Sequence, residues 1–271
     1  MYKLLAADMD GTLLKDDKTI SYSTYKAIQD ARKKGIRVVL STGRYLSGIK
    51  KYLKELNLLI DDEYAVTMNG SLIQNAKSGN ILYKSLLTHD AVKYVCSIGN
   101  TLGTNVELAA FDYFIINKTT KLFELDSKVN DTNLKIMNFN DLSPKLSIFK
   151  IMFVDDGNRL DKLTQELPEN IFNNFTVVRS GENYLEFLNK NTDKGSAIKI
   201  LAKKLGIKSQ DVICIGDAEN DINMIKYAGL GIAMGNAYTS VKKAADYVTR
   251  TNEEDGVAHA IKKFILSENA S

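Results

Sequence analysis

The order of apolar and polar positions near the N-terminus is that of an α/β protein. Short apolar runs at 3–7 and 36–40 flank a helical pattern at 21–34, and a second helical pattern at 45–56 precedes an apolar run at 65–67. Buried strands of a few residues that alternate with amphipathic helices are typical of βαβ units, which form parallel sheets. We therefore predict a parallel sheet covered by helices.

The same alternation returns near the C-terminus. Ile198, Leu201, Ala202 and Leu205 follow the spacing of one helix face, and Gly206 marks the end of that helix. Three further strands are predicted by apolar runs at 211–215, 229–233 and 246–248.

The middle of the chain has a different pattern, with strands at hairpin-like spacing. The predicted strands are 106–110, 113–116, 148–154, 176–178 and 184–188. We therefore predict an α/β fold with a Rossmann-like parallel-sheet core and an inserted α+β cap domain. The core would comprise residues 1–82 and 190–271, and the cap would comprise residues 83–189.

Composition and charge narrow the class of protein. The 271 residues are 44% hydrophobic, and 36 basic against 33 acidic residues leave a net charge of only +3. So balanced a charge indicates neither a nucleic-acid nor a membrane partner. The chain has no signal-peptide pattern and no apolar stretch near the ~20 residues of a membrane helix, so we expect a soluble cytoplasmic protein. Cys214 lies in an apolar run, where a buried thiol is expected.

Two aspartates directly follow the first predicted strand, in Asp8-Met9-Asp10-Gly11-Thr12-Leu13. This position is the carboxyl edge of the sheet, where open α/β sheets bind ligands. Carboxylates one residue apart can face one phosphorus atom from different sides, so that one attacks while the other exchanges protons with the leaving oxygen. The alternative is a simple turn with a helix cap, because short motifs also occur by chance.

Two more segments could bind a phosphoryl group. Ser41-Thr42-Gly43-Arg44 follows the strand at 36–40, and a hydroxyl with free backbone N–H groups at a helix start forms an anion cradle. Arg44 could add positive charge or could be an ordinary solvated helix residue. Lys194 precedes the predicted helix at 195–205, and a single lysine is usually a surface residue, so its role depends on its neighbours.

Acidic residues follow the strand at 211–215, in Gly216-Asp217-Ala218-Glu219-Asn220-Asp221. They suit a hard cation with oxygen ligands, although Asp217 or Asn220 could instead cap the next helix. Gathered around a phosphate, Asp8, Asp217 and Asp221 would repel it and one another by about 4 kcal/mol per pair at ~4 Å. Mg²⁺ and the Lys194 ammonium would bring the site near neutrality, so we predict magnesium as the cofactor.

These four segments resemble, in order and without departure, the motifs of the haloacid dehalogenase superfamily. The insert, with Asn69-Gly70 before it and Val178-Arg179-Ser180-Gly181 near its end, is similar to the type IIB cap of the Cof-like sugar-phosphatase group. The resemblance implies a magnesium-dependent phosphatase, a phosphoric monoester hydrolase. Its substrates would be small phosphorylated metabolites such as sugar phosphates, hydrolysed through an aspartyl phosphate on Asp8.

The resemblance also implies a role for each matching residue. Asp8 would be the nucleophile and a magnesium ligand, Asp10 the general acid/base whose backbone carbonyl also binds the metal, and Asp217 a further ligand. Asp221 would hold a water molecule that the metal binds. The phosphoryl oxygens would be held by the Met9 backbone, Thr42, Gly43, Lys194 and Asn220.

Two other functions stay open. A phosphomutase of the phosphomannomutase type shares this core, cap type and Asp-x-Asp-Gly-Thr motif, and an inactive binding or regulatory scaffold is the non-enzymatic alternative, although it would need no acid/base at Asp10. The core motifs read only the phosphoryl group, so we expect the insert to act as a lid that selects the substrate. Candidate substrate-binding residues are Arg44, Arg179, Glu182 and Tyr184. The sequence leaves sugar phosphates, nucleotides and pyridoxal phosphate open as substrates, and it does not give the oligomeric state.

Overall fold

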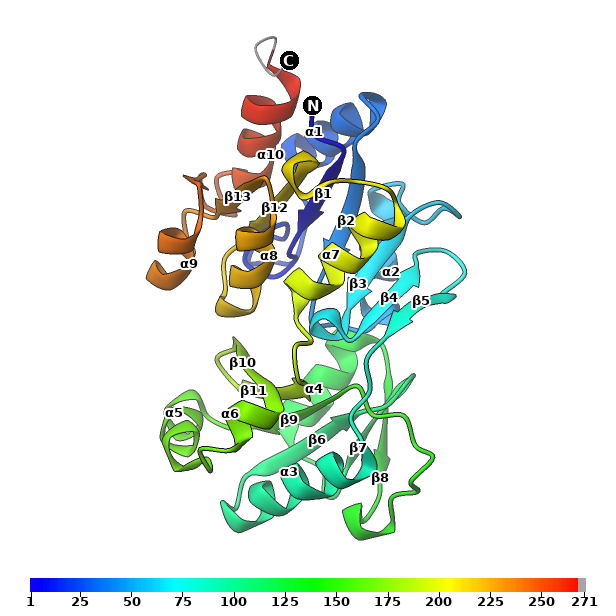
Figure 1. Ribbon diagram of the computed structural model, residues 1–271, viewed down its shortest axis with the longest axis vertical. Helices are drawn as coiled ribbons and strands as arrows, with labels where there is room; N and C mark the ends of the chain where they lie inside the picture. The colour runs from blue at the N-terminus through cyan, green and yellow to red at the C-terminus, as the bar shows by residue number, and fades with distance from the viewer. Residues whose placement is uncertain (268–271) are drawn as a thin grey trace.

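The computed structural model describes residues 1–267 and contains two β-sheets, each with its own helices (Figure 1). The larger, which we name the core sheet, has eight strands in the order β14-β13-β12-β1-β2-β3-β4-β5. The smaller, the cap sheet, has six strands in the order β10-β11-β9-β6-β7-β8. The predicted α/β fold with a mainly parallel core and a separate α+β cap is confirmed.

The core sheet is built from both ends of the chain. Its strands are β1 (Leu4–Ala7), β2 (Arg37–Ser41), β3 (Tyr64–Thr67), β4 (Leu72–Asn75), β5 (Ile81–Lys84), β12 (Val212–Gly216), β13 (Leu230–Ala233) and β14 (Tyr247–Val248). Its helices are α1 (Tyr22–Lys33), α2 (Leu46–Glu55), α7 (Lys194–Lys204), α8 (Ile222–Tyr227), α9 (Thr239–Ala244) and α10 (Gly256–Ile261). Short 3₁₀ or π segments are η1 (Met68–Gly70), η3 (Ser209–Asp211), η4 (Glu219–Asp221) and η5 (Lys262–Leu266).

Both faces of the core sheet are covered at its centre, which explains why β1 and β12 are continuously apolar. Leu5 of β1 packs in one apolar cluster with Ile28 of α1, whereas Leu4 packs in another with Ile198 and Leu201 of α7. Helix α1 begins after Ser21, whose hydroxyl accepts a hydrogen bond from the backbone N–H of Thr24 at 3.0 Å. Successive side chains of a strand point to opposite faces, so β1 contributes to both clusters.

The edge of the core sheet differs from the purely parallel sheet that the sequence pattern suggests. Strands β14 through β3 are parallel, but β4 and β5 join them as an antiparallel extension. Neither strand was predicted, because four-residue segments with mixed polarity carry little periodic signal. The predicted boundary between residues 82 and 83 falls inside β5, and the division into a core and a cap domain at 83 and 189 stays a prediction.

The cap sheet holds the segments predicted as hairpin strands, with shifted ends. Its strands are β6 (Asn105–Ala109), β7 (Tyr113–Ile116), β8 (Asn133–Ile136), β9 (Lys150–Val154), β10 (Phe175–Gly181) and β11 (Tyr184–Asn189). Its helices are α3 (His89–Thr101), α4 (Lys121–Asn130), α5 (Gly157–Glu166), α6 (Ile171–Asn174) and the turn η2 (Phe139–Asp141). Strand β8, which pairs in parallel with β7, was not predicted.

The cap sheet lies against the core through a mixed apolar and polar contact. Phe114 and Phe149 of the cap pack in one cluster with Tyr45 and Met68 of the core. The Tyr45 hydroxyl lies 2.9 Å from the carbonyl oxygens of Ala110 and Tyr113. No helix within residues 1–267 has both the length and the apolar character needed to cross a bilayer.

Candidate active site

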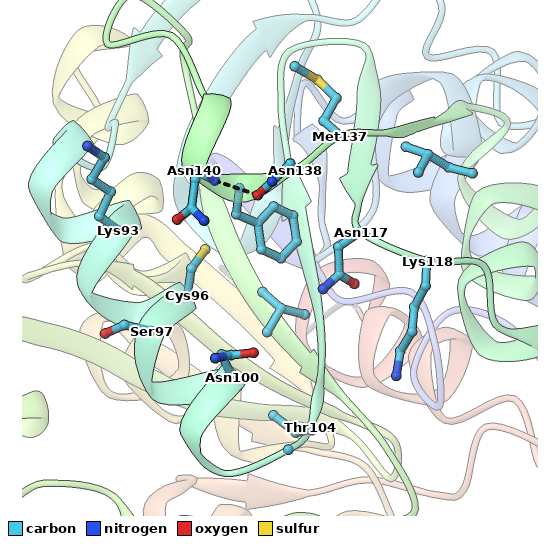
Figure 2. A pocket seen from close by; sticks show the side chains of 14 residues that line it. Lys93, Cys96, Ser97, Asn100, Thr104, Asn117, Lys118, Met137, Asn138 and Asn140 are labelled. Atoms are coloured by element: carbon cyan, nitrogen blue, oxygen red, sulfur yellow. Dashed lines mark hydrogen bonds between the residues drawn. The ribbon is translucent and has the colours of Figure 1, made fainter.

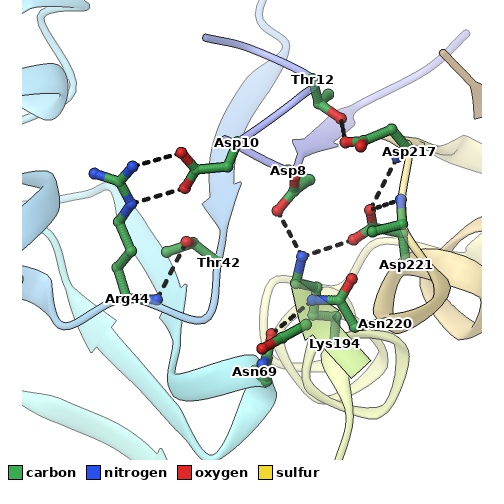
Figure 3. A network of polar contacts seen from close by, with 12 residues as sticks. Asp8, Asp10, Thr12, Thr42, Arg44, Asn69, Lys194, Asp217, Asn220 and Asp221 are labelled. Carbon is green, nitrogen blue, oxygen red and sulfur yellow. Dashed lines mark hydrogen bonds and ion pairs between the residues drawn. The ribbon is translucent and has the colours of Figure 1, made fainter. Parts of the chain in front are cut away.

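Three adjacent parallel strands place the predicted motifs together. In β1, Ala7 pairs with Leu40 of β2 on one side and with Ile215 of β12 on the other. The residues that follow these strands therefore emerge at one edge of the sheet. Figure 3 shows Asp8 between two groups, with Asp10 and Arg44 on one side and Asp217 and Asp221 on the other.

Lys194 lies buried at the centre of this site, where it joins two carboxylates. Its Nζ is 2.5 Å from Asp8 Oδ1 and 2.7 Å from Asp221 Oδ1, and its side chain is 1% exposed. Burial opposes its charge, but Asp221 and Asp8 outweigh burial and raise the Lys194 pKa above its ordinary value. Close packing of η1 places the start of α7, since a Cβ on Gly70 would lie 2.1 Å from the Asp193 carbonyl oxygen. The Lys194 ammonium therefore lies directly against Asp8.

Three carboxylates form a compact acidic cluster beside Lys194. One oxygen each from Asp8, Asp217 and Asp221 lies within 4.8 Å of the others. Burial first, and then repulsion by Asp221, raises the Asp8 pKa well above its ordinary value and the Asp217 pKa to about 7. Buried carboxylates this close are stable as anions only with added positive charge, and oxygen ligands suit Mg²⁺. The donor set of this cluster therefore fits the predicted metal.

Local contacts orient the members of this cluster. The Thr12 hydroxyl donates to Asp217 Oδ1 at 2.6 Å, and the backbone N–H groups of Asp217 and Ala218 donate to Asp221 Oδ2 at 3.0 and 3.1 Å. Only glycine fits at position 216, because a Cβ there would lie 2.4 Å from the Asp221 Cβ. Asp221 is completely buried behind these groups, which suits an orienting role better than a contact with substrate.

Asp10 is held apart from the acidic cluster by cations. Arg44 binds it with two hydrogen bonds, from Nε at 2.8 Å and from Nη2 at 2.5 Å, and Lys18 donates to it at 3.0 Å. Burial pushes the Asp10 pKa upward, but Arg44 and Lys18 outweigh burial and lower it. Arg44 is only 9% exposed, so it is not the solvated helix residue that the sequence left open. Its backbone N–H donates to Thr42 Oγ1 at 3.2 Å.

A cavity of about 300 Å³, which we name the main cavity because Asp8 lines it, lies between this edge and the cap sheet. Its core side is formed by Asp8, Asp10, Thr42, Gly43 and Asn220, and the cap side includes Tyr184. The Met9 backbone was also predicted to bind the phosphoryl group. Met9 is fully buried and lies next to Asp8 in the sequence.

The other two cap candidates lie elsewhere. Arg179 and Glu182 line a neighbouring cavity of about 620 Å³ that shares Asp10 with the first. Arg179 donates to the Glu182 carbonyl oxygen at 2.9 Å and pairs with Asp161 at 3.3 Å. Of the three cap residues proposed from the sequence, only Tyr184 therefore faces the main cavity directly.

Four charged residues inside the cap were not identified from the sequence. Glu107, Asp126, Lys150 and Glu186 are each at most 9% exposed, and the last three line the main cavity. Glu107, Lys150 and Glu186 each interrupt an apolar strand segment, and this is the signal that could have revealed them. Burial and the nearby Asp126 raise the Glu107 pKa well above its ordinary value.

We expect Asp126→Asn to flatten the pH dependence of stability. Burial raises the Asp126 pKa from 3.8 to about 6, so folding favours its protonated form. The stability from this group is complete below about pH 4 and is lost as the pH rises through about 6, by roughly 2–3 kcal/mol. Denaturant titrations should show a larger loss between about pH 4 and pH 7 for the wild type than for Asp126→Asn. Parallel losses in the two proteins would contradict the assignment.

A larger cavity of about 960 Å³ lies inside the cap, away from the acidic cluster. In Figure 2, Lys93, Cys96 and Asn100 of α3 face Asn138 and Asn140 across it. None of its lining residues in the described part of the chain is acidic. This cavity therefore lacks the carboxylates that the predicted chemistry requires. Those carboxylates lie at the edge of the core sheet.

Comparisons with known proteins show the family of this chain. A family model for haloacid dehalogenase-like hydrolases matches residues 5–261. YxeH, a candidate phosphatase of Bacillus subtilis (strain 168), is 35% identical over 270 residues, covering 99% of this chain and 100% of YxeH. YcsE of the same organism, a 5-amino-6-(5-phospho-D-ribitylamino)uracil phosphatase, is 34% identical over 264 residues, covering 97% and 96%.

A solved structure shows the same arrangement of core and cap. The structure of the subclass IIB sugar phosphatase BT4131 matches with a TM-score of 0.82 and 27% identity, over 97% of this chain and 98% of that chain. The family match spans all four motifs. As those motifs predicted, the chain belongs to the haloacid dehalogenase-like hydrolases and carries the cap of their subclass IIB.

Proposed function

We propose that this hydrolase is a magnesium-dependent phosphatase that acts on small phosphorylated metabolites, with Asp8 as the nucleophile. The observation that carries the proposal is the position of Asp8, which lies at the end of β1, bonded to the buried Lys194 and within 4.8 Å of Asp217. Lys194 keeps the Asp8 carboxylate in one orientation and offsets part of its charge. The names of YxeH, YcsE and BT4131 support phosphate esters as substrates.

In the first step, an Asp8 oxygen attacks phosphorus and the ester bond breaks, so that the leaving oxygen takes a proton from Asp10. In the second, water attacks the phosphorus of the aspartyl phosphate and Asp10 takes the proton of that water. The bond between phosphorus and the Asp8 oxygen breaks, which releases inorganic phosphate and restores the Asp8 carboxylate. The negative charge of an incoming phosphoryl group raises the pKa of Asp10, which prepares this residue to act as an acid. Mg²⁺, held by Asp8, Asp217 and the Asp10 carbonyl, would supply two positive charges to the phosphoryl oxygens.

The remaining phosphoryl contacts would come from the Thr42 hydroxyl, the Gly43 N–H and Asn220, which line the cavity after β2 and in η4. Lys194, at the start of α7, would add a fourth contact from its position beside Asp8. The cap would contact the leaving group, since its side of the cavity includes Tyr184 and the charged residues Asp126, Lys150 and Glu186. A cavity of about 300 Å³ matches a small metabolite.

The test is hydrolysis of a panel of phosphorylated metabolites by the purified protein with Mg²⁺, ranked by kcat/KM. We expect release of inorganic phosphate, with sugar phosphates and related polyol phosphates among the better substrates. A phosphomutase would instead convert a hexose 1-phosphate into its 6-phosphate without releasing phosphate. A binding scaffold would turn over no member of the panel, and either of these results would contradict the proposal.

A further inference from the structure

Two buried cap residues contact the loops that would bind the phosphoryl group. Lys150 of β9 is 4% exposed and Glu186 of β11 is 2% exposed. Lys150 Nζ donates to Glu186 Oε1 at 2.9 Å and to the carbonyl oxygen of Gly43 at 3.1 Å. Glu186 also accepts a hydrogen bond from Ser180. The cap pair is therefore bonded directly to the loop after β2.

A second connection runs from Glu186 to Asn220 through one side chain. Asn69 Nδ2 donates to Glu186 Oε2 at 2.8 Å, and Asn69 Oδ1 accepts from Asn220 Nδ2 at 3.0 Å. Asn69 is itself anchored in the core, because its backbone N–H donates to the Thr42 carbonyl oxygen at 3.0 Å. Its amide also packs beside Gly43. Three buried side chains thus form a line from the cap to the loop after β12.

The direction of these bonds gives Asn220 one orientation. Lys150 has only donors, so Glu186 pairs with it as an acceptor, and a carboxylate also accepts from Asn69. The Asn69 amide oxygen must then face Asn220, so Asn220 must donate to it from its NH₂ group. The other end of that amide, Asn220 Oδ1, is buried and has no partner among residues 1–267. Within the described chain, its orientation is set through Asn69.

We propose that Glu186 and Lys150 are positioning residues that orient Asn220 and hold the Gly43 loop, so that the phosphoryl cradle is complete only when the cap lies against the core. This inference rests on the proposed function, because it takes Asn220 and Gly43 as phosphoryl contacts. Opening of the cap would break both connections at once. Closure of the cap over the substrate and assembly of the phosphoryl cradle are therefore one event.

Glu186→Gln tests the relay with little change in volume. The Gln oxygen must face the Lys150 ammonium, so its NH₂ group faces Asn69, where two donors cannot pair. The Asn69 amide then turns over, and the Asn220 amide turns with it. The Asn220 oxygen thereby replaces the Asn220 NH₂ group at the position that would contact the phosphoryl group. We expect kcat/KM to fall by about 10- to 100-fold, the usual effect of losing an outer orienting partner.

The double variant Asn69→Asp/Glu186→Gln should recover much of the lost activity. Aspartate at position 69 accepts from both Gln and Asn220, which restores the original Asn220 orientation at unchanged net charge. Asp155→Asn is the matched control, because this cap carboxylate bonds to Thr104 and Arg159 and to no core residue. Wild-type kcat/KM in folded Glu186→Gln, or a loss that the double variant does not reverse, would overturn the inference.

A second readout separates this inference from the proposed function. Side-chain amide ¹⁵N spectra with inorganic phosphate and Mg²⁺ should show a perturbed Asn220 signal in the wild type and the double variant. In Glu186→Gln this perturbation should be lost. If the wild type hydrolyses no phosphate ester, the proposed function fails. If it is active but the Asn220 spectrum is the same in wild type and Glu186→Gln, only the relay fails.

Discussion

Asp8→Asn is expected to abolish phosphate release while leaving the protein folded. An amide cannot supply the attacking oxygen anion, and loss of a covalent nucleophile lowers kcat by roughly 10⁴- to 10⁶-fold. The volumes of the two side chains are nearly equal, and Asn can still accept the hydrogen bond from Lys194. Because Asp8 is a buried acid whose pKa is raised by burial and by Asp221, its replacement also removes repulsion in the metal-free protein.

Two measurements check this expectation. Phosphate release should be undetectable, and the Tm in EDTA should equal or exceed that of the wild type. Asp30→Asn is the matched control, since Asp30 is a surface residue of α1 that pairs with Lys26 at 2.7 Å; this variant should keep wild-type kcat. Wild-type hydrolysis by folded Asp8→Asn would remove Asp8 from the mechanism.

Removal of divalent metal is expected to have an effect of similar size. Asp8, Asp217 and Asp221 lie close enough to share one cation. Without that cation, their negative charges repel an incoming phosphate. Activity should disappear in EDTA and return with Mg²⁺. Ca²⁺ should substitute poorly, because its longer and more flexible coordination displaces the nucleophile from phosphorus.

The same experiment has a readout independent of catalysis. Mg²⁺ should raise the Tm of the EDTA-treated protein, since a ligand at about 100 times its Kd stabilises the folded state by about 2.7 kcal/mol. Asp217→Asn should need a higher Mg²⁺ concentration for the same rise. Full activity after dialysis against EDTA, or a Tm that does not respond to Mg²⁺, would show that the acidic cluster is not a metal site.

The sequence alone was sufficient for the core of the fold and for the strand-end motifs. Strands β1, β2 and β12 are short apolar runs, and helices α1 and α7 repeat apolar positions at helical spacing. Such periodicity reports which face of an element is buried. Because the carboxyl ends of neighbouring parallel strands share one edge, the positions of Asp8, Thr42 and Asp217 directly after predicted strands were enough to place them together.

Only the tertiary structure decided how polar side chains pair within that edge. Asp10 binds Arg44 across 34 residues of sequence, Lys194 binds Asp8 across 186, and Asn69 binds Glu186 across 117. Periodicity shows that a face is buried but not which other face it meets, because that depends on strand order, register and the seating of the cap. How the charged cap residues pair, and how they connect to Asn220, depends on those distant contacts, which no local pattern encodes.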